Sequence, residues 1–236
     1  KCEKGDYYLS DEELQVLDGV CKCYSNVILV LNSGGIIDLG FKDCYPSIKA
    51  VIQMGQCGME SGNAFADVVS GKVTFGGHLT DTWAFRYEDY PNATTFSYMD
   101  GNVHKEYYKE GIYVGYRYFE TFAKEKVKYP FGFGLSYTKF QTEILGFSVQ
   151  GTAVTAVAKV TNVGGVSGRE TVQLYLEAPQ GKLGKPLRQL TAFAKTEELK
   201  PGETEELLLK TELAEYASYD DSGVTGHKSC YVLEEG

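Results

Sequence analysis

The stretch Val27-Ile-Leu-Val-Leu31, followed by Asn32-Ser-Gly-Gly35, decides the fold class of the first part of the chain. Five consecutive apolar residues that end in a turn sequence are typical of a strand buried on both faces of a parallel sheet. A second apolar run, Ala50-Val-Ile52, has the same character. The sequence therefore predicts a mainly parallel sheet in this region.

Helical signals lie on both sides of these two strands. Ser10-Asp-Glu-Glu13 has the spacing of a capping box, so we expect a helix that runs to about residue 24. Apolar residues follow the box at helical spacing: Leu14, Leu17, Cys21 and Tyr24. The loop Gly58–Asn63 leads into a second predicted helix, Ala64–Val69, with Gly71 as its C-terminal cap. The order helix, strand, strand, helix indicates an α/β domain.

The pattern changes twice in the remainder of the chain. Residues 85–140 hold 17 of the 31 aromatic residues and show no long periodicity, which predicts an extended connector anchored by aromatic side chains. From residue 141 apolar residues alternate with more polar neighbours, as in two runs: Val154, Ala156, Ala158 and Val160, and then Val172, Leu174 and Leu176. Turn sequences such as Lys200-Pro-Gly-Glu203 separate these runs, so we expect a small all-β sandwich. The predicted domains are residues 1–84, 85–140 and 141–236.

Composition excludes several function classes. The 236 residues include 23 Lys and Arg against 32 Asp and Glu, a net charge of −9, which has the wrong sign for nucleic acid or an anionic membrane surface. Runs such as Val27–Leu31 are far shorter than the ~18 apolar residues of a membrane-spanning helix. No basic-then-apolar segment stands at the start of the given sequence, so we expect no targeting signal within it. We therefore expect a soluble protein without nucleic-acid or membrane partners.

The six cysteines do not form a recognisable framework. Cys21 and Cys23 fall within a predicted helix, where residues two apart point to different faces and cannot share a metal at the usual spacing. We expect free thiols, which favours a reducing, cytoplasmic location.

The sequence predicts neither a metal site nor a cofactor. His78, His104 and His227 are isolated from one another and from cysteines at ligand spacing. Ser33-Gly-Gly35 follows a predicted strand but lacks the Gly-Lys-Ser/Thr and G-x-G-x-x-G patterns of phosphate loops, so we interpret it as an ordinary turn.

Acidic residues and tyrosines are the candidates for a functional site, and each also has a simpler structural interpretation. Glu60 precedes a predicted helix and is the most site-like carboxylate, although a favourable interaction with the helix dipole explains it better. Ser61 lacks the preceding glycine of a nucleophile elbow. The connector tyrosines could stack on sugar rings, but we favour a role in fixing an irregular segment between two domains.

Two connector motifs carry a resemblance to a known family. Glu110-Gly-Ile-Tyr-Val-Gly-Tyr-Arg-Tyr-Phe119 and Tyr129-Pro-Phe-Gly-Phe-Gly-Leu-Ser-Tyr137 resemble the C-terminal part of glycoside hydrolase family 3, the β-glucosidase and β-xylosidase group. Gly62–Lys72 resembles a helix of the family's α/β sandwich domain, and Leu79–Trp83 resembles the strand that follows it. Four further segments resemble its fibronectin type III-like module: Val160–Gly164, Glu170–Leu176, Lys185–Leu187 and Leu199–Glu203. The implied fold is a partial α/β sandwich with a mainly parallel sheet, followed by an immunoglobulin/fibronectin type III-like sandwich.

The resemblance also implies a reaction whose catalytic residues lie elsewhere. Family members retain anomeric configuration, with an aspartate nucleophile from a barrel domain that this sequence does not contain. Their acid/base glutamate lies in a Gly-Glu-Gly-like loop upstream of the stretch that Lys4–Ser10 resembles, and Glu3 lacks flanking glycines. We therefore assign no catalytic residue, and the substrate-binding residues stay unknown.

Two departures from the family pattern stand out. Phe75-Gly76 replaces the usual Pro-Ser, and His78 replaces the lysine that follows, so we expect a rebuilt loop there. Relatives continue past Val232–Gly236 into one more strand, so we expect the last strand of the sandwich to be absent, with an exposed edge.

The functional prediction is a fragment or subunit of a retaining β-glycosidase, with β-glucosidase as the first expectation. Its substrate would be an oligosaccharide or aryl β-glycoside, bound through the complete enzyme with its barrel domain. This chain would supply scaffold and part of the cleft wall, and would be inactive alone. The alternatives are a non-catalytic carbohydrate-binding or interaction module, and a complete, degenerate family member with a structural role.

Overall fold

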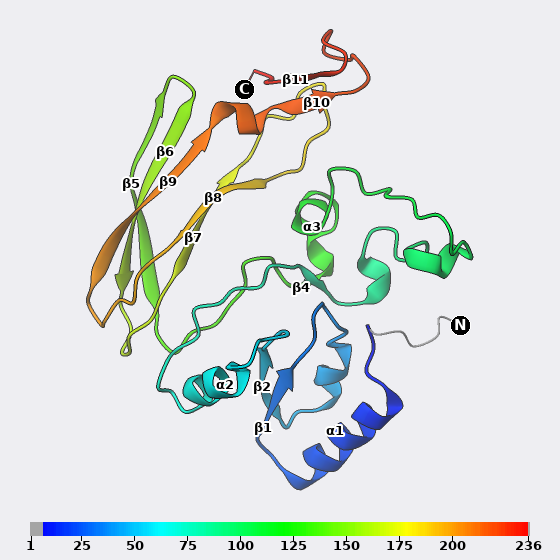
Figure 1. The fold of residues 1–236 in the computed structure, drawn as a ribbon, viewed down its shortest axis with the longest axis vertical. Coiled ribbons are helices and arrows are strands. Elements are labelled where there is room, and N and C mark those ends of the chain that lie inside the picture. Colours follow the sequence, from blue (N-terminus) through cyan, green and yellow to red (C-terminus); the bar gives the residue numbers. More distant parts are fainter. Residues whose placement is uncertain (1–6, 236) are drawn as a thin grey trace.

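A computed structural model of the chain describes residues 7–235 (Figure 1). The first part contains two helices, two strands and a 3-10 helix: α1 (Asp11–Cys23), β1 (Val27–Leu31), η1 (Gly40–Cys44), β2 (Ile48–Gln53) and α2 (Ser61–Val69). β1 and β2 pair in parallel, with Val30 opposite Ile52, which confirms the predicted α/β class and the parallel pairing. The capping box is also present, because the Glu13 amide donates to Ser10 Oγ at 3.2 Å and the Ser10 amide donates to Glu13 Oε2 at 2.8 Å.

The prediction that the first strand is buried on both faces is wrong for the described residues. Leu31 is the buried residue of β1, whereas Ile28 is 52% exposed. The reason is the small size of the sheet, because the described chain supplies only β1 and β2 to it. The continuous apolar run correctly predicts a strand. It does not predict which other segments cover that strand.

The predicted strand Leu79–Trp83 is also much shorter in the structure. β3 (Trp83–Ala84) pairs antiparallel with β4 (Val127–Tyr129), and residues 79–82 are outside the strand. Leu79 still exchanges two backbone hydrogen bonds with Gly132 and Phe133. Pro130 lies between Tyr129 of β4 and Gly132 and has no amide proton to donate to the ladder.

The aromatic segment between the two larger parts is mostly irregular, as predicted, but it contains a short helix. Its elements are η2 (Tyr87–Asp89), η3 (Ser97–Asp100), α3 (Tyr116–Phe122) and η4 (Lys124–Lys126). Gly115, with a φ of 57°, precedes α3, and Phe119 of α3 is fully buried against Ala84 and Ala123. A helix of seven residues is too short to show a clear period in the sequence, which explains why it was not predicted.

The last part is the predicted β-sandwich. One sheet has the order β5-β6-β9, and the other contains the antiparallel pair β7 and β8. The bounds of these strands are β5 (Phe140–Gln150), β6 (Ala153–Asn162), β7 (Thr171–Leu176), β8 (Gln189–Lys195) and β9 (Thr204–Glu212). Alternate residues of β6 are buried, as the alternation predicts: Val154, Ala156, Ala158, Val160 and Asn162. In the predicted turn Lys200–Glu203, Gly202 has a φ of 83° and the Glu203 amide donates to the Lys200 carbonyl at 2.9 Å, as in a type II turn.

The sandwich ends in a 3-10 helix and a small hairpin. These elements are η5 (Leu213–Tyr216), β10 (Ser218–Asp220) and β11 (Cys230–Val232). Asp220 is fully buried and accepts hydrogen bonds from Gly223 N and from Thr225 N and Oγ1, which hold the hairpin loop together. These bonds are made to the charged carboxylate, and the Thr225 side chain makes the largest contribution to lowering the Asp220 pKa.

Candidate functional site

The carboxyl edge of the β1–β2 sheet is the first place to examine, because open parallel sheets bind ligands beyond the ends of their strands. The turn Ser33–Gly35 follows β1, and Ser33 Oγ donates to the Gly35 carbonyl at 2.9 Å. The side chain of Gln56, from the loop after β2, packs on Gly34 so closely that a Cβ at position 34 would lie 2.9 Å from Gln56 Oε1. The geometry is that of the ordinary turn that the sequence predicts.

A cluster of tyrosines lies beside this edge. The Asp38 amide donates to the Tyr7 carbonyl at 2.6 Å, which brings the beginning of the described chain to the loop after β1. The Tyr7 ring centroid is 5.2 Å from that of Tyr87 and 6.0 Å from that of Tyr90. Tyr90 Oη in turn accepts from the Ala84 amide and donates to the Thr82 carbonyl. The cluster therefore joins residue 7 to the connector.

These phenols are suited to packing and hydrogen bonding. Burial raises the pKa of Tyr7 far above its ordinary value, and the neighbouring Tyr90 adds to the shift. Burial likewise raises the pKa of Tyr90. Both phenols stay protonated at neutral pH and cannot act as general bases there. The sequence does not reveal this cluster, because Tyr7 is distant in sequence from Tyr87 and Tyr90. The density of aromatic residues after Phe85 is the available signal.

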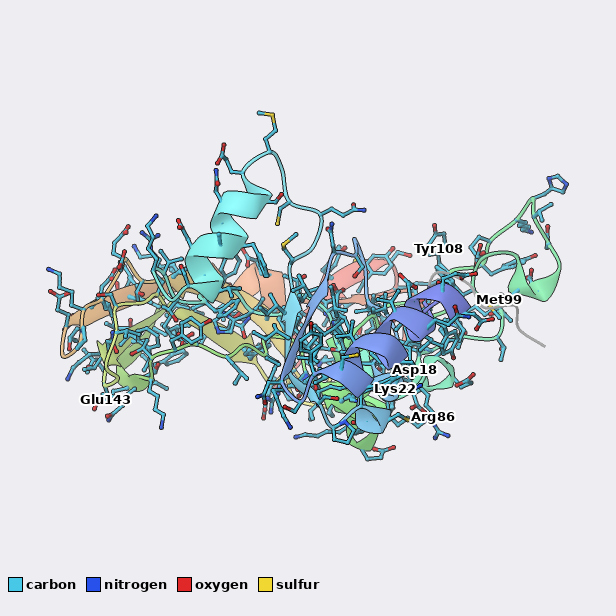
Figure 2. All side chains as sticks on the ribbon, turned by 90° about the horizontal axis from the view of Figure 1, so that it is seen from below. Asp18, Lys22, Arg86, Met99, Tyr108 and Glu143 are labelled. Atoms are coloured by element: carbon cyan, nitrogen blue, oxygen red, sulfur yellow. The ribbon has the colours of Figure 1, made fainter. Side chains whose placement is uncertain are left out.

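Glu60 and Ser61 lie at the start of α2, which projects from the body of the molecule (Figure 2). Glu60 occupies the N-cap position, but its carboxylate is exposed and accepts from Asn63 Nδ2 at 2.5 Å instead of capping the helix. Ser61 is the first helical residue. Glu3 falls outside the described residues.

The three histidines occupy separate places. His78 Nε2 is 3.2 Å from Glu170 Oε1, in a contact between the loop before β3 and the β-sandwich. His104 lies on the connector and His227 in the β10–β11 loop. Within residues 7–235, no group of three or more His, Cys, Asp or Glu side chains could hold a metal ion. The described part of the chain has free thiols at Cys21, Cys23, Cys44, Cys57 and Cys230.

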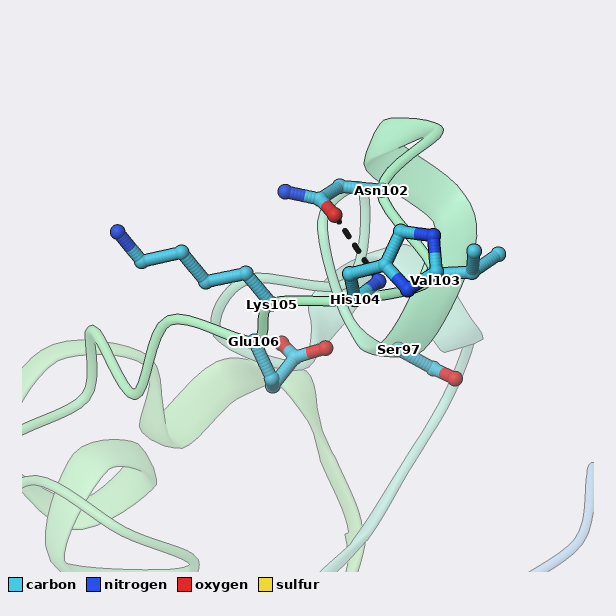
Figure 3. A pocket seen from close by; sticks show the side chains of 6 residues that line it. All are labelled: Ser97, Asn102, Val103, His104, Lys105 and Glu106. Atoms are coloured by element: carbon cyan, nitrogen blue, oxygen red, sulfur yellow. Dashed lines mark hydrogen bonds between the residues drawn. The ribbon is translucent and has the colours of Figure 1, made fainter.

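A shallow pocket opens on the connector after η3 (Figure 3). Its volume is about 310 Å³, and six residues line it: Ser97, Asn102, Val103, His104, Lys105 and Glu106. Side-chain to backbone bonds shape the loop, since Asp100 Oδ1 accepts from the Asn102 amide and Asn102 Oδ1 accepts from the His104 amide. Glu106 is the one carboxylate of the lining, whereas a retaining glycosidase requires two. The pocket therefore lacks the groups for glycoside hydrolysis.

The connector tyrosines divide into anchoring and exposed residues. Tyr116 Oη accepts from the Leu190 amide at 2.8 Å, and its ring lies 4.7 Å from that of Phe131, which fixes α3 to the β-sandwich. Tyr107 and Tyr108 are 50% and 89% exposed. Tyr108 lies on the outlying part of the connector in Figure 2. The anchoring role favoured by the sequence thus describes Tyr116, while Tyr108 is available for a ligand.

Replacing Glu170 with glutamine is expected to reduce the acid sensitivity of the protein. Burial alone would raise the Glu170 pKa, but hydrogen bonds from His78 and the Thr171 amide, with the charges of His78 and Lys195, bring it below the ordinary value of 4.5. A depressed carboxyl pKa stabilises the fold above about pH 4.5, and this stability is lost as the pH falls through the lower folded-state pKa. The contribution is below about 1 kcal/mol, because the pair is partly exposed.

The measurement is urea denaturation of wild type and Glu170→Gln at about pH 7 and about pH 4. At the higher pH the variant is expected to be less stable than wild type, and at the lower pH the difference should shrink. The exposed acid Glu198, changed to glutamine, is the control for the loss of a surface carboxylate. A stability difference for Glu170→Gln that does not change with pH would contradict the prediction.

Comparison with known proteins gives the chain its family. Residues 1–116 match the family described as the glycosyl hydrolase family 3 C-terminal domain, and residues 170–236 match the fibronectin type III-like domain. A β-glucosidase of Ruminococcus albus is 44% identical over 235 residues, which are 100% of this chain and 24% of that protein. A β-glucosidase A of Butyrivibrio fibrisolvens is 42% identical, over 99% of this chain and 30% of that protein.

Solved structures of β-glucosidases are also similar to this chain in fold and sequence. A β-glucosidase of Paenibacillus barengoltzii superposes with a TM-score of 0.93 at 45% identity, over 100% of this chain and 26% of that one. β-Glucosidase 3B of Thermotoga neapolitana, solved with α-D-glucose, has a TM-score of 0.84 at 37% identity, over 93% of this chain and 31% of that one. The chain thus spans about a quarter of the length of the relatives that it matches. No helix in the described range is long and apolar enough to cross a membrane. With a family 3 C-terminal domain followed by a fibronectin type III-like domain, the chain belongs to glycoside hydrolase family 3 and corresponds to the C-terminal portion of its β-glucosidases.

Proposed function

We propose that the chain is a structural part of a retaining β-glucosidase that removes terminal β-linked sugars from oligosaccharides or aryl β-glycosides. The observation that carries this proposal is the likeness of the whole chain to the Paenibacillus barengoltzii β-glucosidase, at a TM-score of 0.93 and 45% identity. The catalytic carboxylates would come from the remainder of the enzyme, including a barrel domain. The domain divisions after residues 84 and 140 and the cytoplasmic location stay predictions.

The geometry supports a positioning role for this part of the enzyme. The carboxyl edge of the β1–β2 sheet and the Tyr7, Tyr87 and Tyr90 cluster form a fixed surface at the beginning of the described chain. Tyr116 and the His78–Glu170 pair hold the connector and its neighbouring loop to the β-sandwich. Catalysis by preorganised groups requires supports that do not move during the reaction. We assign this support, and part of the cleft wall, to the present chain.

The isolated 236-residue chain is expected to release no p-nitrophenol from p-nitrophenyl β-glucoside or β-xyloside above a mock purification. The pocket on the connector holds one carboxylate, Glu106, whereas retaining glycoside cleavage needs an acid and a nucleophile. The complete enzyme is expected to hydrolyse the β-glucoside under the same conditions.

Activity of the isolated chain that survives repurification would contradict the proposal. Glu3 and Glu60 would then be the first carboxylates to change, each to glutamine. An inactive complete enzyme with a folded barrel domain would contradict the assignment to β-glucosidases.

A second candidate function, glycan binding by the connector, is favoured by the exposure of Tyr108. An aromatic ring that is 89% exposed, two residues along the chain from Glu106 of the pocket lining, can stack on the apolar face of a sugar. Titration of the isolated chain with cello-oligosaccharides tests this function. Millimolar or tighter binding that is lost in Tyr108→Ala and kept in Tyr24→Ala, a control tyrosine that is 64% exposed, would favour the binding module. Absence of binding would contradict the glycan-binding function and favour the structural role.

A further inference from the structure

The carboxylate of Glu234 lies in a cradle that one loop of the β-sandwich provides. This loop joins β7 to β8 and is here called the β7–β8 loop (residues 177–188). Glu234 Oε1 accepts from the Lys182 amide at 2.6 Å, and Glu234 Oε2 accepts from the Leu183 amide at 3.3 Å. A Cβ at Gly181 would lie 2.6 Å from Glu234 Cδ, so a glycine is required where the loop passes the carboxylate. The loop is therefore shaped around Glu234.

The side chain of Lys185 completes the cradle. Lys185 Nζ lies 2.6 Å from Glu234 Oε2 and donates to the Pro179 carbonyl at 2.8 Å. Both side chains of the ion pair are largely buried, with exposed fractions of 5% and 11%. The hydrogen bond from Lys185 makes the largest contribution to keeping the Glu234 pKa below its ordinary value, so this carboxylate is charged at neutral pH. Loss of the Glu234 charge would leave the lysine charge buried and unpaired, so the conformation of the loop depends on Glu234.

The same loop carries contacts that hold helix α3 of the connector. The Leu187 amide donates to Thr121 Oγ1 at 2.9 Å. Arg188 Nε lies 3.0 Å from Glu120 Oε2. Glu120 and Thr121 belong to α3, which lies beside the β-sandwich in Figure 1. A loop that is fixed by Glu234 therefore presents a fixed surface to α3.

The backbone between the cradle and these contacts has little freedom. Pro186 separates Lys185 from Leu187, and a proline fixes its own φ and restricts the residue before it. Gly184 packs on the connector, since a Cβ at this position would lie 3.1 Å from Tyr113 Oη. A displacement of the cradle would thus be transmitted to the connector through contiguous contacts.

We propose that Glu234 is a positioning residue of the complete enzyme, which holds the connector in place through the β7–β8 loop. Glu234 fixes the loop, and the loop fixes α3. The role at the cleft rests on the proposed function, which assigns part of the cleft wall to this chain. A displaced wall weakens substrate binding without changing the reacting groups, so the kinetic effect falls on KM.

Hydrogen exchange in the 236-residue chain measures the coupling between Glu234 and the connector. Glu234→Gln keeps the size of the side chain and removes its charge, and is expected to speed exchange of the α3 amides by roughly tenfold or more. Glu234→Asp keeps the charge on a shorter side chain and should have a smaller effect. The exposed neighbour Glu235, changed to glutamine, is the matched control and is expected to leave the exchange unchanged. The amides of β6 are the internal reference, because a general loss of stability would speed their exchange as well.

Kinetics of the complete enzyme with p-nitrophenyl β-glucoside test the role at the cleft. Glu234→Gln is expected to raise KM by roughly threefold or more and to change kcat by less than about twofold. A merely structural role would lower the amount of folded enzyme and leave KM unchanged, because the molecules that remain folded would bind substrate normally. Glu235→Gln is the control in this measurement too, with KM and kcat as in wild type.

Three results would overturn the proposal. The first is exchange of the α3 amides that Glu234→Gln does not change. The second is faster exchange in α3 with an equal increase in β6, because Glu234 would then stabilise the fold in general. The third is an active complete enzyme in which Glu234→Gln leaves KM unchanged.

The two measurements separate this proposal from the proposed function. A folded complete enzyme that does not hydrolyse the β-glucoside rejects the β-glucosidase assignment, while exchange in the 236-residue chain still decides whether Glu234 holds α3. An active enzyme whose α3 amides do not respond to Glu234→Gln rejects the role of Glu234 alone.

Discussion

Replacing Phe119 with alanine is expected to lower the free energy of unfolding by about 3–5 kcal/mol. Phe119 is fully buried, and its ring meets that of Tyr90 edge-on, with centroids 5.5 Å apart. Ala84 and Ala123 form the remainder of the buried cluster and are too small to fill the space that the ring would vacate. The loss therefore combines the transfer free energy of the ring with the cost of a cavity.

Fluorescence of the single tryptophan, Trp83, in a urea titration measures this loss. Trp83 is buried and adjacent to Ala84, so its emission reports on the region that contains the cavity. Phe122→Ala is the control on the same helix, because Phe122 is 58% exposed and should cost no more than about 1 kcal/mol. Equal losses for Phe119→Ala and Phe122→Ala would show that the Phe119 ring does not hold the cluster together.

Replacing Asn162 with alanine is expected to destabilise the β-sandwich by about 3 kcal/mol. The Asn162 side chain is fully buried and makes four hydrogen bonds. Its Nδ2 donates to the carbonyls of Val166 and Leu199, and its Oδ1 accepts from Thr138 Oγ1 and the Gly164 amide. Alanine removes all four bonds. The Leu199 carbonyl still accepts a hydrogen bond from the Gly168 amide. The Val166 carbonyl, Thr138 Oγ1 and the Gly164 amide each lose the bond that Asn162 makes to them.

Thermal unfolding followed by far-ultraviolet circular dichroism measures the effect on the sandwich. Thr161→Ala is the control, because the neighbouring Thr161 hydroxyl pairs with Thr204 Oγ1 in an exposed contact. Its loss should cost about 1 kcal/mol or less. Asn162→Asp should be nearly as damaging as alanine, since a carboxylate cannot donate to the two carbonyls. A stable aspartate variant would refute the assignment of donors.

Features encoded by neighbouring residues could be predicted from the sequence. The Ser10–Glu13 capping box, the alternation from Val154 to Val160 and the turn at Gly202 each depend on a few adjacent positions, and each is present in the structure. Helix α3 was not predicted, because what fixes it is the burial of Phe119 between distant segments. The exposure of Ile28 and of Phe147 in β5 also depends on what covers them, and a residue's own apolarity does not contain that information.

For the candidate site, too, features that join distant segments could not be predicted from adjacent residues. The sequence singled out Glu60 from its place before a helix, and the structure shows it exposed beside Asn63. The Tyr7 cluster and the His78–Glu170 contact join positions about eighty to ninety residues apart, so no local pattern marks them. The interpretation of the chain as a portion of a longer enzyme rests on the resemblance, and the comparisons support it. That its catalytic residues lie elsewhere stays a prediction.

The two anchors of the connector have an evolutionary consequence. Tyr90 fixes the chain before the pocket loop through Ala84 and Thr82, and Tyr116 fixes it afterwards through Leu190. Insertions and deletions between these anchors need not move either neighbouring domain. Doubling the length of a flexible loop costs only about 0.6 kcal/mol of closure entropy. Natural variation in length should therefore accumulate between Tyr90 and Tyr116, while the anchors themselves diverge slowly.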